Sequence, residues 1–255
     1  MKVYSVQLNT VWENKTATYE RARQLVLEAA PAQGSLIVLP ETFSTGFSTN
    51  LAVTAQGPDL EDEKFLAALA RDTKCTITAG IVSRLTPQKG RNESVTFGPD
   101  GSLIARYGKI HPFSMGGELE VHQPGTEIVT FELNGFTVAP FVCYDLRFPE
   151  IFRSAVDRGA NLFVVIANWP VKRDRHWLTL LQARAIENLA YVVGVNRCGI
   201  DPQFFYSGRS VVVNPHGIII ADAGGEEHVT VTELDLDLVQ TWRQEFPPLR
   251  DRHWK

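Results

Sequence analysis

The chain has 255 residues, of which 44% are hydrophobic and 21% are charged, and its formal net charge is −4. These are ordinary proportions for a globular protein, and the dispersed Lys and Arg residues argue against a nucleic-acid partner, which needs a clustered basic surface. The longest apolar runs, such as residues 162–167, are far too short to span a membrane.

Strand-like and helix-like segments alternate through the first half of the chain. Apolar side chains at helical spacing predict helices over residues 14–30 and 60–71. Strands are predicted over residues 2–8, 36–40, 75–83, 93–97 and 103–109. Glu41 directly follows the second of these strands and Lys109 ends the last. Strand ends are where α/β sheets usually place functional side chains.

The second half continues the alternation. Helices are predicted over residues 149–157 and 175–189. Strands are predicted over residues 127–131, 136–142, 162–167, 191–196, 210–213, 217–220 and 229–234. No linker or repeat divides the chain, so we expect one layered α/β domain over residues 1–255. The pattern alone does not choose between a Rossmann-like sheet and a four-layer sandwich.

Cys143 lies between a predicted strand and a predicted helix that begins near Pro149. A cysteine at a strand end is most often a small buried hydrophobic residue. A strand–turn–helix bend would instead expose the side chain above the sheet, and the helix N–H groups would lower the pKa of its thiol. Polar residues follow at once, among them Tyr144 and Arg147. This setting favours a reactive thiol.

Glu41 and Lys109 are ambiguous when each is taken alone, since both types of side chain are often simply solvated at strand ends. Together with Cys143 they would supply a proton carrier, a cation and a nucleophile, the three groups that attack on an amide requires. A papain-like pairing of Cys143 with His111 or His176 is the alternative. No CxxC or HExxH motif is present, so we predict no metal site.

Three motifs occur in order along the chain: LIVLPETFSTGF (36–47), YGKIH (107–111) and VCYDLRFPE (142–150). They closely resemble the Glu, Lys and Cys motifs of the nitrilase superfamily of carbon–nitrogen hydrolases. The segments ANWP (167–170) and YSGRS (206–210) are similar to the bacterial omega-amidase branch. The resemblance runs nearly from end to end and implies a four-layer αββα sandwich.

The resemblance also implies roles for individual residues. Glu41 would be the acid/base, Cys143 the nucleophile and Lys109 the oxyanion support, with the backbone N–H of Tyr144 as the second oxyanion donor. Glu118 matches the second glutamate of the family's site. The loop that carries it departs from the family pattern, and this leaves Glu120 as a rival.

The implied reaction is hydrolysis of the terminal amide of small, α-keto dicarboxylic acid monoamides, without a cofactor or metal. Arg147 or Arg173 would bind the distal carboxylate, or else form a structural ion pair. True nitrilases, N-carbamyl amidases and the methionine-salvage amidase share the triad, and a catalytically silent scaffold is the non-enzyme alternative.

The family usually pairs into homodimers, and the resemblance places the tail, residues 235–255, at that interface. Trp242, Phe246 and Trp254 would suit such a contact. Three widely spaced cysteines and the absence of an export signal predict a cytoplasmic protein with no membrane partner.

Overall fold

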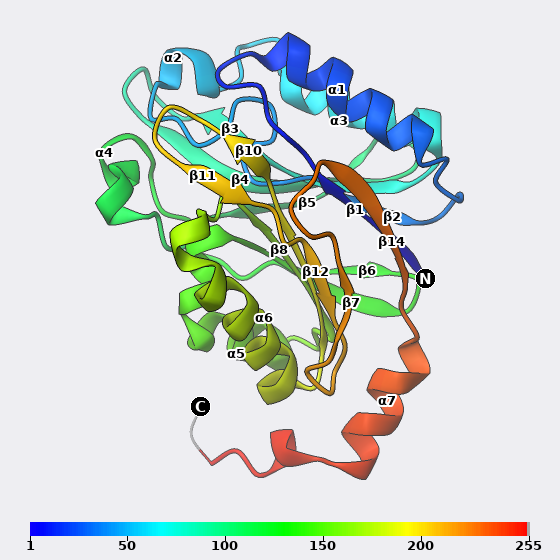
Figure 1. Ribbon diagram of the computed structural model, residues 1–255. Coiled ribbons are helices and arrows are strands. Elements are labelled where there is room, and N and C mark those ends of the chain that lie inside the picture. The colour runs from blue at the N-terminus through cyan, green and yellow to red at the C-terminus, as the bar shows by residue number, and fades with distance from the viewer. Residues whose placement is uncertain (254–255) are drawn as a thin grey trace.

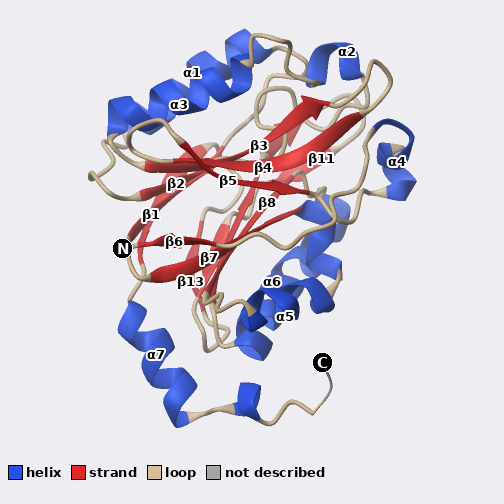
Figure 2. Cartoon of the chain, turned by 180° about the vertical axis from the view of Figure 1, so that it is seen from behind, coloured by secondary structure: helices blue, strands red, loops and turns tan. Residues whose placement is uncertain are grey.

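The computed structural model describes residues 1–253. Two six-stranded sheets lie face to face, and a pair of helices covers the outer face of each (Figures 1 and 2). This arrangement is the four-layer αββα sandwich that the resemblance predicts. No helix of the described chain combines the length and the apolar character that crossing a membrane demands.

The first sheet has the strand order β14–β1–β2–β3–β4–β5. Its strands are β1 (Lys2–Gln7), β2 (Leu36–Val38), β3 (Thr76–Arg84), β4 (Gly90–Phe97), β5 (Leu103–Gly108) and β14 (His228–Glu233). The parallel strands β1, β2 and β3 are joined by crossovers that contain α1 (Lys15–Glu28) and α3 (Glu61–Thr73), which cover this sheet. Leu36 and Val38 point to the second sheet while Ile37 points to the helices, as strand alternation requires.

The second sheet has the strand order β13–β12–β9–β8–β7–β6. Its strands are β6 (Phe131–Leu133), β7 (Phe136–Val142), β8 (Leu162–Ala167), β9 (Tyr191–Asn196), β12 (Val211–Val213) and β13 (Ile219–Asp222). The helices α5 (Pro149–Asp157) and α6 (Asp174–Asn188) cover its outer face (Figure 1). All six residues of β8 are buried, because this strand has a sheet on one face and helices on the other.

Several predicted strands differ in extent: the strand predicted over 36–40 ends at Val38, and the one predicted over 217–220 spans Ile219–Asp222. The strand predicted over 127–131 is also wrong in extent. Residues 127–130 are not a strand, and β6 spans Phe131–Leu133 only. The reason is that β6 is an edge strand whose partner is β7, and the tight turn at Asn134 and Gly135 brings only three residue pairs into register.

Several short elements were not predicted. They are α2 (Leu51–Thr54), α4 (Glu118–Val121), the hairpin of β10 (Cys198–Ile200) and β11 (Phe205–Ser207), and α7 (Leu236–Glu245). The helix α7 packs against its own chain, because Arg243 donates hydrogen bonds to the carbonyl oxygens of Ala160, Asn188 and Leu189. Trp254, which was predicted to join the tail contact, lies outside the described residues.

Candidate active site

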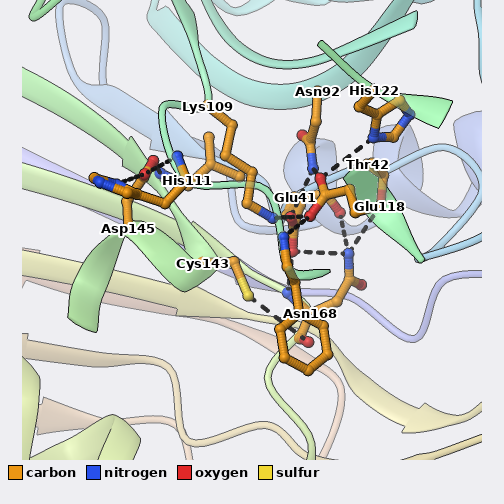
Figure 3. Close-up of polar contacts among 12 residues, drawn as sticks. Glu41, Thr42, Asn92, Lys109, His111, Glu118, His122, Cys143, Asp145 and Asn168 are labelled. Atoms are coloured by element: carbon orange, nitrogen blue, oxygen red, sulfur yellow. Dashed lines mark hydrogen bonds and ion pairs between the residues drawn. The ribbon is translucent and has the colours of Figure 1, made fainter. Parts of the chain in front are cut away.

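Three strand ends meet between the two sheets (Figure 3). Glu41 follows β2 and Lys109 follows β5 of the first sheet, while Cys143 follows β7 of the second. The structure therefore brings together three side chains that are up to a hundred residues apart in the chain. None of the three is a freely solvated strand-end residue, since Glu41 and Lys109 are buried and Cys143 is partly buried.

The backbone at Glu41 packs directly on β3. The Gly80 N–H donates to the Pro40 carbonyl oxygen at 3.0 Å, and the Phe43 N–H donates to the Gly80 carbonyl oxygen at 2.9 Å. A Cβ atom at position 80 would lie 2.5 Å from the Glu41 Cα atom, so a side chain there would displace the segment that carries Glu41.

The Lys109 ammonium is buried between two carboxylates. Its Nζ atom is 2.8 Å from Glu41 Oε1 and 2.8 Å from Glu118 Oε2. Burial by itself lowers the pKa of Lys109, but the charges of Glu118 and Glu41 outweigh burial and raise that pKa above its ordinary value. Lys109 is therefore a fixed cation at neutral pH.

Glu118 is the first residue of α4 and is buried, whereas its rival Glu120 is exposed. Burial by itself raises the pKa of Glu118. The Lys109 charge, together with hydrogen bonds from His122, Lys109 and the Phe113 N–H, outweighs it and lowers the pKa to about 2. The structure thus places Glu118, and not Glu120, beside Lys109 as an ionised carboxylate.

Two asparagines that the sequence analysis missed complete this network. The Asn92 side-chain amide, on β4, donates to Glu41 Oε1 and to Glu118 Oε1, at 2.8 Å each. The Asn168 N–H donates to Glu41 Oε2 at 2.8 Å, and its carbonyl oxygen accepts a 4.0 Å contact from the Cys143 thiol. The Asn168 peptide therefore lies between the carboxylate and the thiol. In the sequence, Asn168 has the same signal as Glu41, because each is a polar residue that follows a buried apolar strand.

Cys143 begins the 3₁₀ helix η2 (Cys143–Arg147) and has a φ of 48°, in the left-handed region that a non-glycine residue rarely adopts. Such a sharp bend presents the side chain above the sheet, as the sequence predicted. The predicted lowering of the thiol pKa is wrong. Burial and then the Glu41 charge raise the pKa of Cys143 well above its ordinary value, and the Lys109 charge only partly opposes them. The short 3₁₀ helix η2 does not offset these two effects on the pKa of the thiol.

The two histidines of the papain-like alternative lie elsewhere. His111 donates its backbone N–H to Asp145 and places Nδ1 3.0 Å from the same carboxylate. His176 is exposed, and its Nδ1 atom lies 3.4 Å from the Arg147 guanidinium. Within residues 1–253 neither histidine forms a hydrogen bond with Cys143. Neither histidine is therefore paired with Cys143.

Cys143 opens into a pocket with largely aromatic walls. Its aromatic lining residues are Phe47, Phe113, Tyr144, Trp169, Phe204 and Tyr206. Phe204 and Tyr206 come from the β10–β11 hairpin, which the sequence analysis did not detect. The aromatic rings therefore surround the approach to the thiol.

Arg147 and Arg173 both line this pocket. The Arg147 guanidinium lies 4.7 Å from the centre of the Trp169 ring, and that of Arg173 lies 5.5 Å from the centre of the Phe113 ring. Neither arginine forms an ion pair with a carboxylate in the described part of the chain. Burial, and then the charge of Arg173, lower the pKa of Arg147. Two positive charges thus face one pocket without a protein anion between them.

His, Cys, Asp and Glu are the possible metal ligands among the residues that the structure describes. Across residues 1–253 no three His, Cys, Asp or Glu side chains gather in a group that suits a metal. The two carboxylates at the site are already bonded to Lys109 and to asparagine amides.

Comparison with known proteins identifies relatives along almost the whole chain. The family model of carbon-nitrogen hydrolases matches residues 2–244. The omega-amidase YafV of Yersinia enterocolitica is 40% identical over 253 residues, which are 98% of this chain and 96% of the relative. A 2-oxoglutaramate amidase of Bacillus subtilis is 32% identical over 229 residues, which are 89% of this chain and 88% of the relative.

Solved structures of similar proteins match the same length of chain. XC1258 of Xanthomonas campestris, a CN-hydrolase superfamily protein, has a TM-score of 0.93 and 33% identity, and the match covers 100% of this chain and 98% of that one. Nit3 of Saccharomyces cerevisiae, a member of branch 10 of the nitrilase superfamily, has a TM-score of 0.89 and 29% identity, with 100% and 97% covered.

Proposed function

This chain belongs to the carbon-nitrogen hydrolase family and is an amidase, and from that premise we propose that it removes the terminal amide of small dicarboxylic acid monoamides through a thioester on Cys143. Monoamides of α-keto dicarboxylic acids are the preferred substrates in this proposal. It draws support from the omega-amidase and 2-oxoglutaramate amidase relatives and from the charges that line the pocket.

The proposed cycle starts with proton transfer from Cys143 to Glu41. The thiolate attacks the amide carbon, and Lys109 and the Tyr144 N–H stabilise the oxyanion that forms; loss of one such donor typically costs about 3 to 4 kcal/mol of barrier. Glu41 returns the proton to the departing ammonia, which leaves a thioester on Cys143. Glu41 then removes a proton from water, the hydroxide attacks the thioester, and the free acid leaves as the thiol regains its proton.

Glu118 has a supporting role in this proposal. Its carboxylate binds the Lys109 ammonium as Glu41 does, and Asn92 joins the two carboxylates. Because Lys109 has two anionic partners, it remains in place when Glu41 accepts a proton and loses its charge. We therefore assign Glu118 to the positioning of Lys109.

The observation that carries the acidic substrate is the pair of arginines in the pocket. Arg147 and Arg173 have no carboxylate partner among residues 1–253, and their guanidinium groups lie on the Trp169 and Phe113 rings. The Arg147 guanidinium also contacts His176 Nδ1, a ring nitrogen and not an anion. A buried or half-buried cation is stabilised by an anionic partner. A substrate whose amide lies over Cys143 and whose carboxylate lies at the far end would supply that anion.

The test is an ammonia-release assay on four compounds: α-ketoglutaramate, succinamate, a neutral amide of equal length and the matching nitrile. We expect the highest kcat/KM for the acidic amides. Arg147→Ala or Arg173→Ala should reduce that advantage by roughly 10- to 150-fold, the equivalent of one charge-assisted hydrogen bond. Arg175→Ala is the matched control, since this exposed arginine of α6 does not line the pocket.

Three results would change the assignment. Equal kcat/KM for acidic and neutral amides would contradict the acidic substrate while leaving amide hydrolysis intact. Faster turnover of the nitrile would move the chain to the nitrilase branch. An absence of turnover on every compound, with Cys143 unreactive, would favour the silent scaffold.

A further inference from the structure

Asp145 has a completely buried carboxylate, and the proposed reaction does not use it. Its Oδ2 atom accepts hydrogen bonds from the Tyr107 hydroxyl at 2.8 Å and from the Val142 N–H at 3.1 Å. Its Oδ1 atom accepts from the His111 N–H at 2.9 Å and lies 3.0 Å from His111 Nδ1 (Figure 3). Four donors on one carboxylate compensate for the loss of its hydration.

These donors belong to the two segments that carry the reacting groups. Tyr107 and His111 lie two residues before and two residues after Lys109, and Val142 directly precedes Cys143. One carboxylate therefore joins the segment of Lys109, in the first sheet, to the bend of Cys143, in the second. The donor at Val142 also closes the first turn of η2, where Cys143 has its left-handed backbone conformation.

The partners of Asp145 are themselves held in place. The His111 ring stacks on Phe148, with ring centres 3.7 Å apart and planes within 9°. Burial, and then the charge and hydrogen bond of Asp145, raise the pKa of Tyr107 well above its ordinary value, so this phenol remains a neutral donor. The link therefore consists of groups with little freedom to rearrange.

We propose that Asp145 is a positioning residue for amide hydrolysis, which sets the placement of Lys109 relative to Cys143 without contact with the substrate. The proposal rests on the function proposed above, because it takes Lys109 and Cys143 as the groups that react. The physical reason is geometric, since a displacement of about 1 Å between reacting groups reduces the rate by roughly 100-fold.

The first experiment compares Asp145→Asn with Asp62→Asn. The NH₂ group of an asparagine side chain is a donor, so it cannot accept the hydrogen bonds that one of the Asp145 oxygens now accepts from N–H and O–H groups. Asp62 is a matched control, because it is equally buried and accepts the Tyr19 hydroxyl at 2.7 Å, but it lies in α3 on the outer layer. We expect kcat to fall about 100-fold in Asp145→Asn with KM within threefold, and to stay within threefold of wild type in Asp62→Asn.

A second readout separates positioning from general destabilisation. The Lys109 charge lowers the pKa of the Cys143 thiol, and this effect weakens with distance. The pH profile of Cys143 alkylation by iodoacetamide should therefore move to higher pH in Asp145→Asn and remain unchanged in Asp62→Asn. A folded Asp145→Asn enzyme with wild-type kcat, or with reduced kcat and an unchanged alkylation profile, would overturn the proposal.

The histidine partner offers a test that does not depend on the folding of Asp145→Asn. The amide of His111→Asn can replace the Nδ1 donor, whereas His111→Leu removes it and keeps an apolar side chain against Phe148. We expect His111→Asn to retain most of the kcat that His111→Leu loses, and equal kcat values would contradict the proposal. Activity in Cys143→Ala would instead refute the proposed function, so the two failures are distinguishable.

Discussion

At the residue scale, the Cys143 thiol is surrounded by opposing charges. Burial raises the pKa of the thiol, the Glu41 charge raises it further, and the Lys109 charge lowers it by less. A raised pKa means that the neutral thiol predominates at all pH values below it. The Cys143 thiol is therefore protonated at neutral pH, and in the proposed cycle the thiolate forms only as Glu41 takes the proton during attack.

Alkylation by iodoacetamide tests this charge balance. Cys143 should react ahead of Cys75 and Cys198, because it is partly exposed and the other two are buried. Since only the thiolate reacts, its rate should still rise about tenfold per pH unit around pH 8 to 9. Peptide mass mapping over a pH series measures both, with Cys143→Ala as the control that should stay unlabelled. A plateau reached near pH 7 would show that the thiol is already ionised.

Glu41, the proposed proton carrier, has a matched control on β4 of the same sheet. Glu41→Gln keeps the shape of the side chain but cannot take the thiol proton, so kcat should fall by about 10²- to 10⁴-fold. Glu93→Gln should have little effect on kcat, because Glu93 is equally buried but pairs with Arg106. His176→Ala should likewise retain turnover of a neutral amide. A folded, inactive His176→Ala beside an active Glu41→Gln would restore the Cys–His alternative.

The sequence predicted some of these residues and not others for identifiable reasons. Glu41, Lys109 and Cys143 end strands and lie in recognisable motifs, so both pattern and resemblance point to them. Asn92 lies in the middle of β4, where nothing local separates an inward-facing polar residue from an outward-facing one. Its importance depends on Glu41 and Glu118, two residues brought to it only by the folded sheet.

At the scale of elements, some helices and strands were predicted from the sequence and others were missed. The helix α5 and the strand β8 have the predicted bounds, because a proline at the first helical position and an uninterrupted apolar run are strong local signals. The β10–β11 hairpin has no comparable pattern, since each of its two strands has a single buried residue, Cys198 in β10 and Tyr206 in β11. The helix α7 was missed because Val239 is its only buried residue.

The tail has contacts of its own in the described chain. Trp242 packs between His216 and Phe246, with ring centres 4.3 and 5.2 Å away. Arg243 anchors α7 to three carbonyl oxygens, and burial lowers the pKa of this arginine to about 10. Removal of the whole tail would therefore disturb the subunit itself, and a point variant is the better probe of the predicted homodimer.

Phe246→Ala is that variant. Phe246 is 51% exposed, and aromatic anchors dominate many interfaces, so its truncation should weaken a dimer that forms through the tail. Phe205→Ala is the matched control, because Phe205 is also 51% exposed but lies on the β10–β11 hairpin. Light scattering over a concentration series should show a lower dimer fraction for Phe246→Ala only. An identical dimer fraction for both variants would place the contact elsewhere.

At the scale of the whole molecule, the sandwich explains why a charged site exists in its interior. Glu41 and Lys109 reach it from the first sheet and Cys143 reaches it from the second, so the site forms only when the two sheets pack (Figure 3). The buried Lys109 cation there is paired with two carboxylates, Glu41 and Glu118. The two arginines of the pocket have no such partner within residues 1–253, and the proposed acidic substrate supplies it.

The central claim is that the acyl group of the amide passes through a thioester on Cys143, and mass spectrometry after rapid acid quench tests it most directly. Wild-type enzyme mixed with α-ketoglutaramate or succinamate should show an adduct of the substrate minus ammonia, mapped to the peptide that contains Cys143 and removed by hydroxylamine. The adduct should be absent in Cys143→Ala, which should also release no ammonia. An adduct on another residue, or ammonia release by Cys143→Ala, would contradict the account.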